Sequence, residues 1–206
     1  MNYQNTNSIN DIIKYCRITD PKHEELSVFA FDHSGHAVGT NSHVLLATST
    51  PFDISKAGRT FKNSDFLNGH FSESEIAFCH WKQVLPTECT KKINIKIPSW
   101  FKFFDQADES ATMSIDYSDI TKPFIKITES NEQNSFSFNA KYLSLFAGEE
   151  VSILIQGALS SLVILDKNSS IDPLSKFINE EILKEKWFYI LMPIKLDKKA
   201  LEKVYF

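Results

Sequence analysis

Short apolar stretches, each of a length typical of a β-strand, recur along the second half of this 206-residue sequence. The clearest is the run in which Ile93, Ile95 and Ile97 alternate with polar residues, which is the period of a strand with one buried face. Strands dominate this half, so we expect a β-rich protein. The further strands predicted here are Ala111–Tyr117, Phe124–Thr128, Val151–Ile155, Ser161–Leu165 and Trp187–Leu196.

The first half contains a predicted β-hairpin. Leu26–Phe31 and His36–Thr48 have the composition of strands, and the four residues from Asp32 to Gly35 tolerate tight-turn geometry. Trp81–Pro86 is predicted to be extended. Residues 50–75 are irregular and are expected to form a loop with one short strand.

Helices are predicted in three places. Apolar residues recur at helical spacing over residues 9–17, and residues 98–104 form a plausible short helix. Phe138 to Gly148 is predicted as a helix, with Asn139 as its N-cap and Gly148 as its C-cap. Residues 166–186 are polar and are expected to form an inserted loop or a short helix.

These elements predict an α+β fold of antiparallel sheets with few short helices. Hydrophobic residues make up 42% and charged residues 23%, which is ordinary for a globular protein with a substantial core. The polar stretch 87–92 is the best candidate boundary, because each half runs from helix to strands. We therefore predict two abbreviated subdomains, residues 1–90 and residues 91–206.

Net charge and cysteine content limit the classes of protein to which this chain can belong. The net charge of −4 argues against a protein that coats nucleic acid through bulk positive charge, although local basic patches remain compatible with it. The three cysteines form no CxxC pair, which favours free thiols in a reducing compartment. The polar start resembles no signal peptide, and no apolar run approaches the roughly 18 residues of a membrane span. We expect a soluble, cytoplasmic protein that does not enter membranes.

No motif for enzymatic chemistry is evident. The sequence has no phosphate-binding loop, dinucleotide fingerprint, HExxH or GxSxG. Asp32, His33 and His36 are either metal ligands or a solvated turn with incidental histidines, and the turn is favoured because a site needs three or four convergent ligands. Cys79 and His80 are adjacent, so on a strand they point to opposite faces. We therefore predict no catalytic residue, no cofactor and no metal.

Three separated segments resemble the bacterial DNA sliding clamp, the β subunit of DNA polymerase III. Ala37–Ala47 is similar to the clamp strand that ends in A-T-D-G-H-R-L-A, with Asn41-Ser42 in place of Asp-Gly and Val44 in place of Arg. His80–Pro86 resembles P-D-Y-R-R-V-L-P, and Phe138–Leu196 ends like the clamp's V-M-P-M-R-L. The chain is about half as long as a three-domain clamp, which fits a shortened, divergent form of phage or mobile-element type.

The resemblance implies a hydrophobic pocket that receives a short peptide, of the form Q-L-[S/D]-L-F, from DNA polymerase or clamp-loader proteins. Apolar walls and a few polar groups suit such a ligand. The alternative is that the same residues are ordinary strand core. The implied pocket residues are Thr40, Ser42, His43, Val44, Leu45, Gln83, Val84, Ser161, Ile190, Leu191, Met192, Pro193 and Ile194.

The resemblance further implies a ring around double-stranded DNA, built as a homo-oligomer. Lys14, Arg17, Lys102 and Lys141 lie on candidate helices and are either DNA-facing or ordinary solvated lysines and arginine. The main alternative is a monomeric adaptor or decoy that keeps the peptide pocket without binding DNA. A third alternative is an enzyme whose site is not evident from the sequence.

Two segments carry further expectations. Tyr142–Phe146 resembles the partner motif, but Leu143 and Phe146 share one helix face, so we expect core packing instead. Residues 197–206 can form an amphipathic turn that packs beside the peptide pocket or caps a sheet edge.

Overall fold

A computed structural model describes residues 23–49, 54–63, 72–104, 112–116, 121, 123–127, 135–157 and 160–193. The chain divides into two compact units. Met1–Pro86 and Asn179–Ile190 make up the first unit, and Thr87–Ile178 and Leu191–Phe206 make up the second. The sequence analysis placed the boundary at residue 90 and assigned all later residues to the second subdomain. It did not predict that residues 179–190 belong to the first unit.

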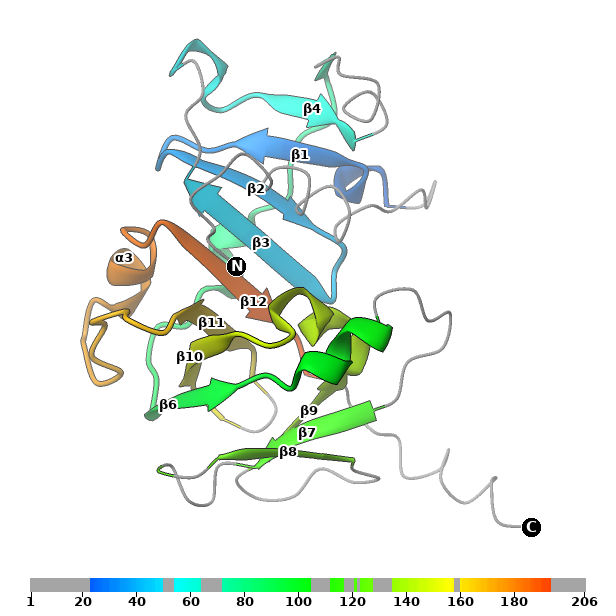
Figure 1. The fold of residues 1–206 in the computed structure, drawn as a ribbon. Coiled ribbons are helices and arrows are strands. Elements are labelled where there is room, and N and C mark those ends of the chain that lie inside the picture. The colour runs from blue at the N-terminus through cyan, green and yellow to red at the C-terminus, as the bar shows by residue number, and fades with distance from the viewer. Residues whose placement is uncertain are drawn as a thin grey trace. The chain divides into compact units, whose positions relative to one another are not determined.

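The described strands of the first unit lie side by side in a sheet, and in Figure 1 they run from blue to teal, with β12 in orange-red. Three short 3₁₀ helices and part of one α-helix accompany the sheet. The strands, in sheet order, are β5 (Glu73–Ser74), β4 (Thr60–Lys62), β1 (Val28–Phe31), β2 (His36–Thr40), β3 (Val44–Ser49) and β12 (Trp187–Leu191). The helices are η1 (Glu24–Leu26), η2 (Ile54–Lys56), η3 (Trp81–Val84) and α3 (Ile178–Ile182).

The predicted hairpin of the first unit is confirmed. β1 and β2 pair in antiparallel register, with Phe31 opposite Ala37. Gly35 has a φ of 88°, a left-handed conformation that glycine adopts at little cost, and its N–H donates to the Asp32 carbonyl at 3.0 Å. The Asp32 N–H donates in turn to the His36 carbonyl at 2.7 Å, which closes the turn.

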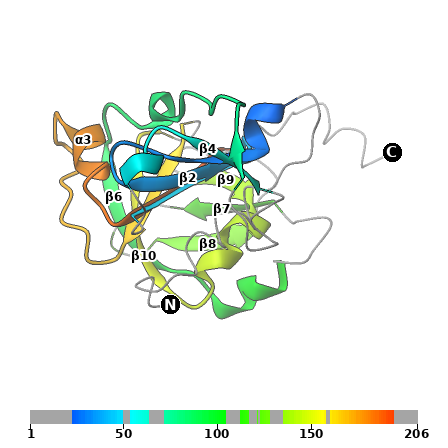
Figure 2. The same ribbon diagram turned by 90° about the horizontal axis from the view of Figure 1, so that it is seen from above.

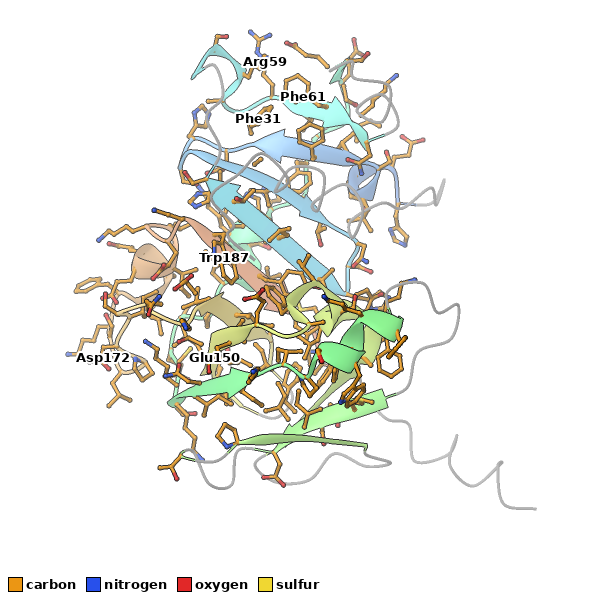
Figure 3. The ribbon with its side chains drawn as sticks, in the orientation of Figure 1. Phe31, Arg59, Phe61, Glu150, Asp172 and Trp187 are labelled. Atoms are coloured by element: carbon orange, nitrogen blue, oxygen red, sulfur yellow. The ribbon has the colours of Figure 1, made fainter. Side chains whose placement is uncertain are left out.

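An aromatic cluster forms the core on one side of this sheet. The rings of Phe29 and Phe61 stack with their centroids 5.6 Å apart, and Phe31 meets Phe61 edge-on at 5.3 Å. Phe31 and Phe61 are labelled in Figure 3. All three side chains are buried, and each contributes on the order of 2–3 kcal/mol through removal from water.

The described residues of the second unit form two sets of neighbouring antiparallel strands and two 3₁₀ helices. In the first set the order is β11 (Leu162–Asp166), β10 (Glu150–Ile155) and β6 (Lys91–Lys96). In the second it is β8 (Phe124–Ile127), β7 (Thr112–Asp116) and β9 (Ser135–Asn139). The helices are η4 (Ser99–Phe104) and η5 (Ala140–Phe146).

The α+β class, with antiparallel sheets and few short helices, is therefore confirmed. Two predictions about helical segments are wrong. Trp81–Pro86 was expected to be extended, but residues 81–84 turn as η3. The predicted helix start at Phe138 lies within β9, because Phe136 and Phe138 alternate with serines in the period of a strand, and the helical turn begins only at Ala140.

The predicted caps of η5 are partly confirmed. The Asn139 side chain accepts a hydrogen bond from the Lys141 N–H at 2.9 Å, as an N-cap does. Gly148 has a φ of 88° and follows the end of the helix. Leu143 and Phe146 are buried, so the Tyr142–Phe146 segment packs in the core as expected.

No helix in the described ranges is both long enough and apolar enough to cross a membrane. The helix predicted over residues 9–17 and the segment 197–206 lie outside the described residues.

Candidate functional site

A tight turn between β2 and β3 presents part of the predicted pocket. The sequence predicted one strand over His36–Thr48, but the chain reverses at residues 41–43. The Asn41 Oδ1 atom accepts hydrogen bonds from the N–H groups of His43 at 3.0 Å and Val44 at 2.9 Å. Ser42 adopts a φ of 70°, which this side-chain bonding stabilises.

The turn separates exposed from buried residues. Ser42 and His43 are exposed at its tip. Thr40, by contrast, is buried, and its hydroxyl donates to the Val44 carbonyl at 2.7 Å. Val44 and Leu45 are buried in β3. Only the tip of this segment is therefore available to a ligand.

The helix η3 is fixed to the first unit at two points. Trp81 stacks on Phe188 of β12, with centroids 5.9 Å apart and ring planes 29° apart. Lys82 Nζ lies 3.0 Å from Asp32 Oδ2. These anchors leave Gln83 exposed and Val84 half-buried at the surface.

The remaining predicted residues differ in exposure. Ile190 and Leu191 are fully buried in β12. Met192 and Pro193, which follow that strand, and Ser161, which precedes β11, are half-buried. Ile194 lies outside the described residues. Thr40, Ser42, His43, Val44, Leu45, Gln83, Val84 and Ile190 belong to the first unit, and Ser161, Leu191, Met192 and Pro193 belong to the second.

The first unit contains a cavity of about 720 Å³ that the sequence did not predict. Gln83 is the one residue that this cavity shares with the predicted pocket. Charged pairs lie along its lining, where Arg59 Nη1 is 2.5 Å from Glu73 Oε1. The lining comprises Ala30, Phe31, Asp32, Gly58, Arg59, Thr60, Glu73, Ser74, Glu75, Ile76, Ala77, Phe78, Cys79, His80, Trp81, Lys82 and Gln83.

Two titratable groups that line the cavity have pKa values shifted from their ordinary values. Burial opposes ionisation of Asp32, but hydrogen bonds from Ser34 and the contact with Lys82 outweigh it and hold the pKa below its ordinary value. Burial raises the pKa of the Cys79 thiol. A thiol with a raised pKa stays protonated at neutral pH and is a weak nucleophile.

One of the two histidines weighed as metal ligands, His36, is engaged within the protein, whereas His33 is exposed. His36 Nε2 donates to the Glu185 carbonyl at 2.9 Å, which leaves Nδ1 to accept from the Ser34 hydroxyl at 3.0 Å. Asp32, the second member, contacts Lys82. Within the described ranges, no group of three or more histidines, cysteines or carboxylates converges on a metal position.

Two of the four predicted DNA-facing residues lie on neighbouring elements. Lys102 is exposed on η4, and Lys141 is half-buried on η5. These two helices contact each other within the second unit and appear side by side, in green and yellow-green, in Figures 1 and 2. Lys14 and Arg17 lie outside the described residues.

Several solved bacterial sliding clamps share the fold of this chain. The polymerase III β subunit of Caulobacter crescentus aligns with a TM-score of 0.59 at 15% identity, over 91% of this chain and 65% of its own. The Bacillus subtilis clamp aligns with a TM-score of 0.60 at 12% identity, over 90% of this chain and 61% of its own. The Thermotoga maritima β subunit aligns with a TM-score of 0.59 at 14% identity, over 92% of this chain and 64% of its own.

The chain therefore has the fold of the bacterial sliding clamps, as the sequence resemblance implied, and spans less than two thirds of their length. No family model matches the sequence, and no curated protein matches it either.

Proposed function

We propose that the chain is a non-enzymatic, clamp-like processivity scaffold that holds replication proteins at DNA. The observation that carries this proposal is the likeness to sliding clamps over about nine tenths of the chain. The order of the three clamp-like segments in the sequence adds independent support, because it does not depend on the structural alignment.

Processivity by a clamp is topological, since a closed ring needs only diffuse contact with DNA. A chain that spans 61–65% of these clamps carries about two of a clamp's three domains. Three copies are then needed to supply a six-domain ring. We therefore propose a homotrimer around double-stranded DNA.

Lys102 and Lys141 are proposed to face that DNA. Neither ammonium group pairs with a carboxylate of the described residues, and the helices that carry them are in contact. Two lysines on adjacent elements, without a carboxylate partner among the described residues, supply local positive charge on a chain whose net charge is −4.

The peptide pocket is proposed to use the accessible members of the predicted set for direct contact. His43, Gln83 and Ser161 offer hydrogen-bonding groups, and Val84 and Met192 offer apolar surface. Met repacks easily around varied ligands. Thr40, Val44, Leu45, Ile190 and Leu191 are buried and are proposed to support these groups, while Val44 lacks the donor that clamps place there.

Two probes suit this pocket. One is a peptide carrying Q-L-S-L-F. The other is griselimycin, to which the Pseudomonas aeruginosa and Bartonella birtlesii clamps were solved bound. Calorimetric titration of the full chain should detect binding of at least one probe. A folded protein that binds neither probe contradicts the pocket.

A monomeric adaptor or decoy is the second candidate, and the acidic net charge favours it over a DNA-encircling ring. Sedimentation velocity separates the two functions. A mass near three times 23.6 kDa supports the ring, and a monomer at all accessible concentrations supports the adaptor.

A further inference from the structure

Two aromatic side chains of η4 project into solvent. Phe103 is 82% exposed and Trp100 is 45% exposed, whereas Phe101 of the same turn is fully buried. The Trp100 ring lies 4.6 Å from the Phe101 ring centroid and 5.9 Å from that of Phe104. These contacts hold the indole in place with part of its surface uncovered.

Cationic groups accompany these rings. Lys102 lies between Trp100 and Phe103 in sequence and is exposed. η5 contacts η4 and contributes Lys141. Among the described residues, neither ammonium group has a carboxylate partner.

We propose that this η4–η5 surface, formed by Trp100, Lys102, Phe103 and Lys141, binds single-stranded nucleic acid. Unpaired bases expose flat faces that stack on aromatic rings, while the phosphates between them attract ammonium groups. In a duplex the base faces are covered by neighbouring base pairs, so the bases cannot stack on the exposed Phe103 ring. The two lysines also favour a polyanion over an apolar protein partner.

This site lies on the second unit alone. It shares Lys102 and Lys141 with the surface proposed to face duplex DNA, but it requires neither ring closure nor the peptide pocket. Phe103 distinguishes the two proposals, because only the single-strand site uses its ring.

Fluorescence anisotropy of the full chain with labelled oligothymidylate tests the proposal, with a duplex of equal length as the comparison. We expect tighter binding to the single strand. Two lysine–phosphate contacts predict a slope of about −1.4 for log K against log salt. Phe103→Ala should weaken binding about tenfold, and Phe103→Trp should retain it. Lys102→Ala should reduce the magnitude of the slope by about 0.7.

Matched controls come from another exposed segment of the same unit. Phe177 is 63% exposed, and Lys176 precedes it. Phe177→Ala and Lys176→Ala should bind oligothymidylate as the unmodified chain does. Because Phe103 is exposed, the Phe103→Ala variant should keep the circular dichroism spectrum and melting temperature of the parent.

Tryptophan fluorescence gives a second readout. Trp81 and Trp187 are 6% and 7% exposed, so quenching by a stacked base should arise from Trp100. Trp100→Phe should abolish the quenching and retain most of the affinity.

Three results would overturn the proposal: no binding of oligothymidylate at low salt, equal binding by the folded Phe103→Ala variant, or tighter binding to the duplex. A Phe103→Ala variant that changes the sedimenting mass but not the affinity for oligothymidylate would instead identify a protein interface.

Discussion

His36 Nε2 lies 2.9 Å from the carbonyl oxygen of Glu185, a residue that precedes the last strand of the first unit. The imidazole also meets the Phe188 ring edge-on, with centroids 5.4 Å apart. One buried side chain on β2 thus contacts the segment that returns from the far end of the sequence. The neutral form of His36 is part of what holds that segment in the first unit.

The His36 bond makes the stability of the first unit depend on pH. Burial lowers the pKa of His36 below 6.5, despite the opposing effects of the Glu185 hydrogen bond and Asp32. Its stabilising contribution is therefore complete above about pH 6.5 and is lost as pH falls through the lowered folded-state pKa. We expect the urea midpoint to fall over this range. His36→Gln should remove that part of the pH dependence, and the exposed His43→Gln should not.

Asp32 contributes in a lower pH range. Its pKa lies below the ordinary 3.8, so its contribution is present above that value and is lost as pH falls through the lower folded-state pKa. For the range near pH 6.5, a His36→Gln variant that keeps the full pH dependence of stability would show that groups other than His36 cause that dependence.

The anchor of η3 should depend more on packing than on charge. Trp81→Ala removes a buried ring stacked on Phe188, and we expect a loss of about 3–5 kcal/mol of unfolding free energy. Lys82→Met breaks the contact with Asp32, but the lysine side chain is 47% exposed, so screening limits the cost to about 1 kcal/mol or less. Equal losses in chemical denaturation would contradict this order.

Asn41 should control the turn between β2 and β3. Asn41→Ala leaves the N–H groups of His43 and Val44 without their acceptor, and we expect a cost of about 1–3 kcal/mol. Ser42→Gly should be neutral or stabilising, because Ser42 already adopts a positive φ. Thermal melts of both variants test this contrast, and a destabilised Ser42→Gly would argue against the turn geometry.

Two buried serines in the second unit should tolerate removal of their hydroxyls. Ser114 and Ser137 lie opposite each other on β7 and β9, and their Oγ atoms have no hydrogen-bond partner in the described part of the chain. Ser114→Ala should be neutral or stabilise by about 1 kcal/mol. Ser152→Ala is the matched control, because Ser152 Oγ donates to Asn94 Oδ1 at 2.6 Å, and its loss should destabilise by about 1 kcal/mol. Differential scanning calorimetry compares the stabilities of the two variants. A Ser114→Ala variant less stable than Ser152→Ala would contradict the assignment of Ser114 as a serine without a hydrogen-bond partner among the described residues.

Elements with a strong local pattern could be predicted from the sequence. The Asp32–Gly35 turn needs only residues that tolerate its geometry, and the Ile93, Ile95, Ile97 alternation by itself predicts β6. The break at Asn41 could not be predicted in the same way, because it depends on two side-chain hydrogen bonds around a serine at positive φ.

Features that depend on contacts between distant segments also could not be predicted from the sequence. The cavity in the first unit combines residues 30–32, 58–60 and 73–83, and these separate segments carry no sequence motif for a cavity. The return of residues 179–190 rests on non-local contacts such as His36 with Glu185. The predicted pocket residues follow only from the resemblance, and they divide into exposed residues such as His43 and buried residues such as Leu45.

The most direct test of the clamp-like function is retention on circular DNA. The purified chain is assembled on a covalently closed circular duplex, challenged with high salt, and separated from free protein by gel filtration. The same DNA is then cut once and the separation repeated. We predict that the protein stays with the circle in high salt and is lost from the linear form, because a ring slides off a free end. Equal loss from both forms would contradict an encircling clamp.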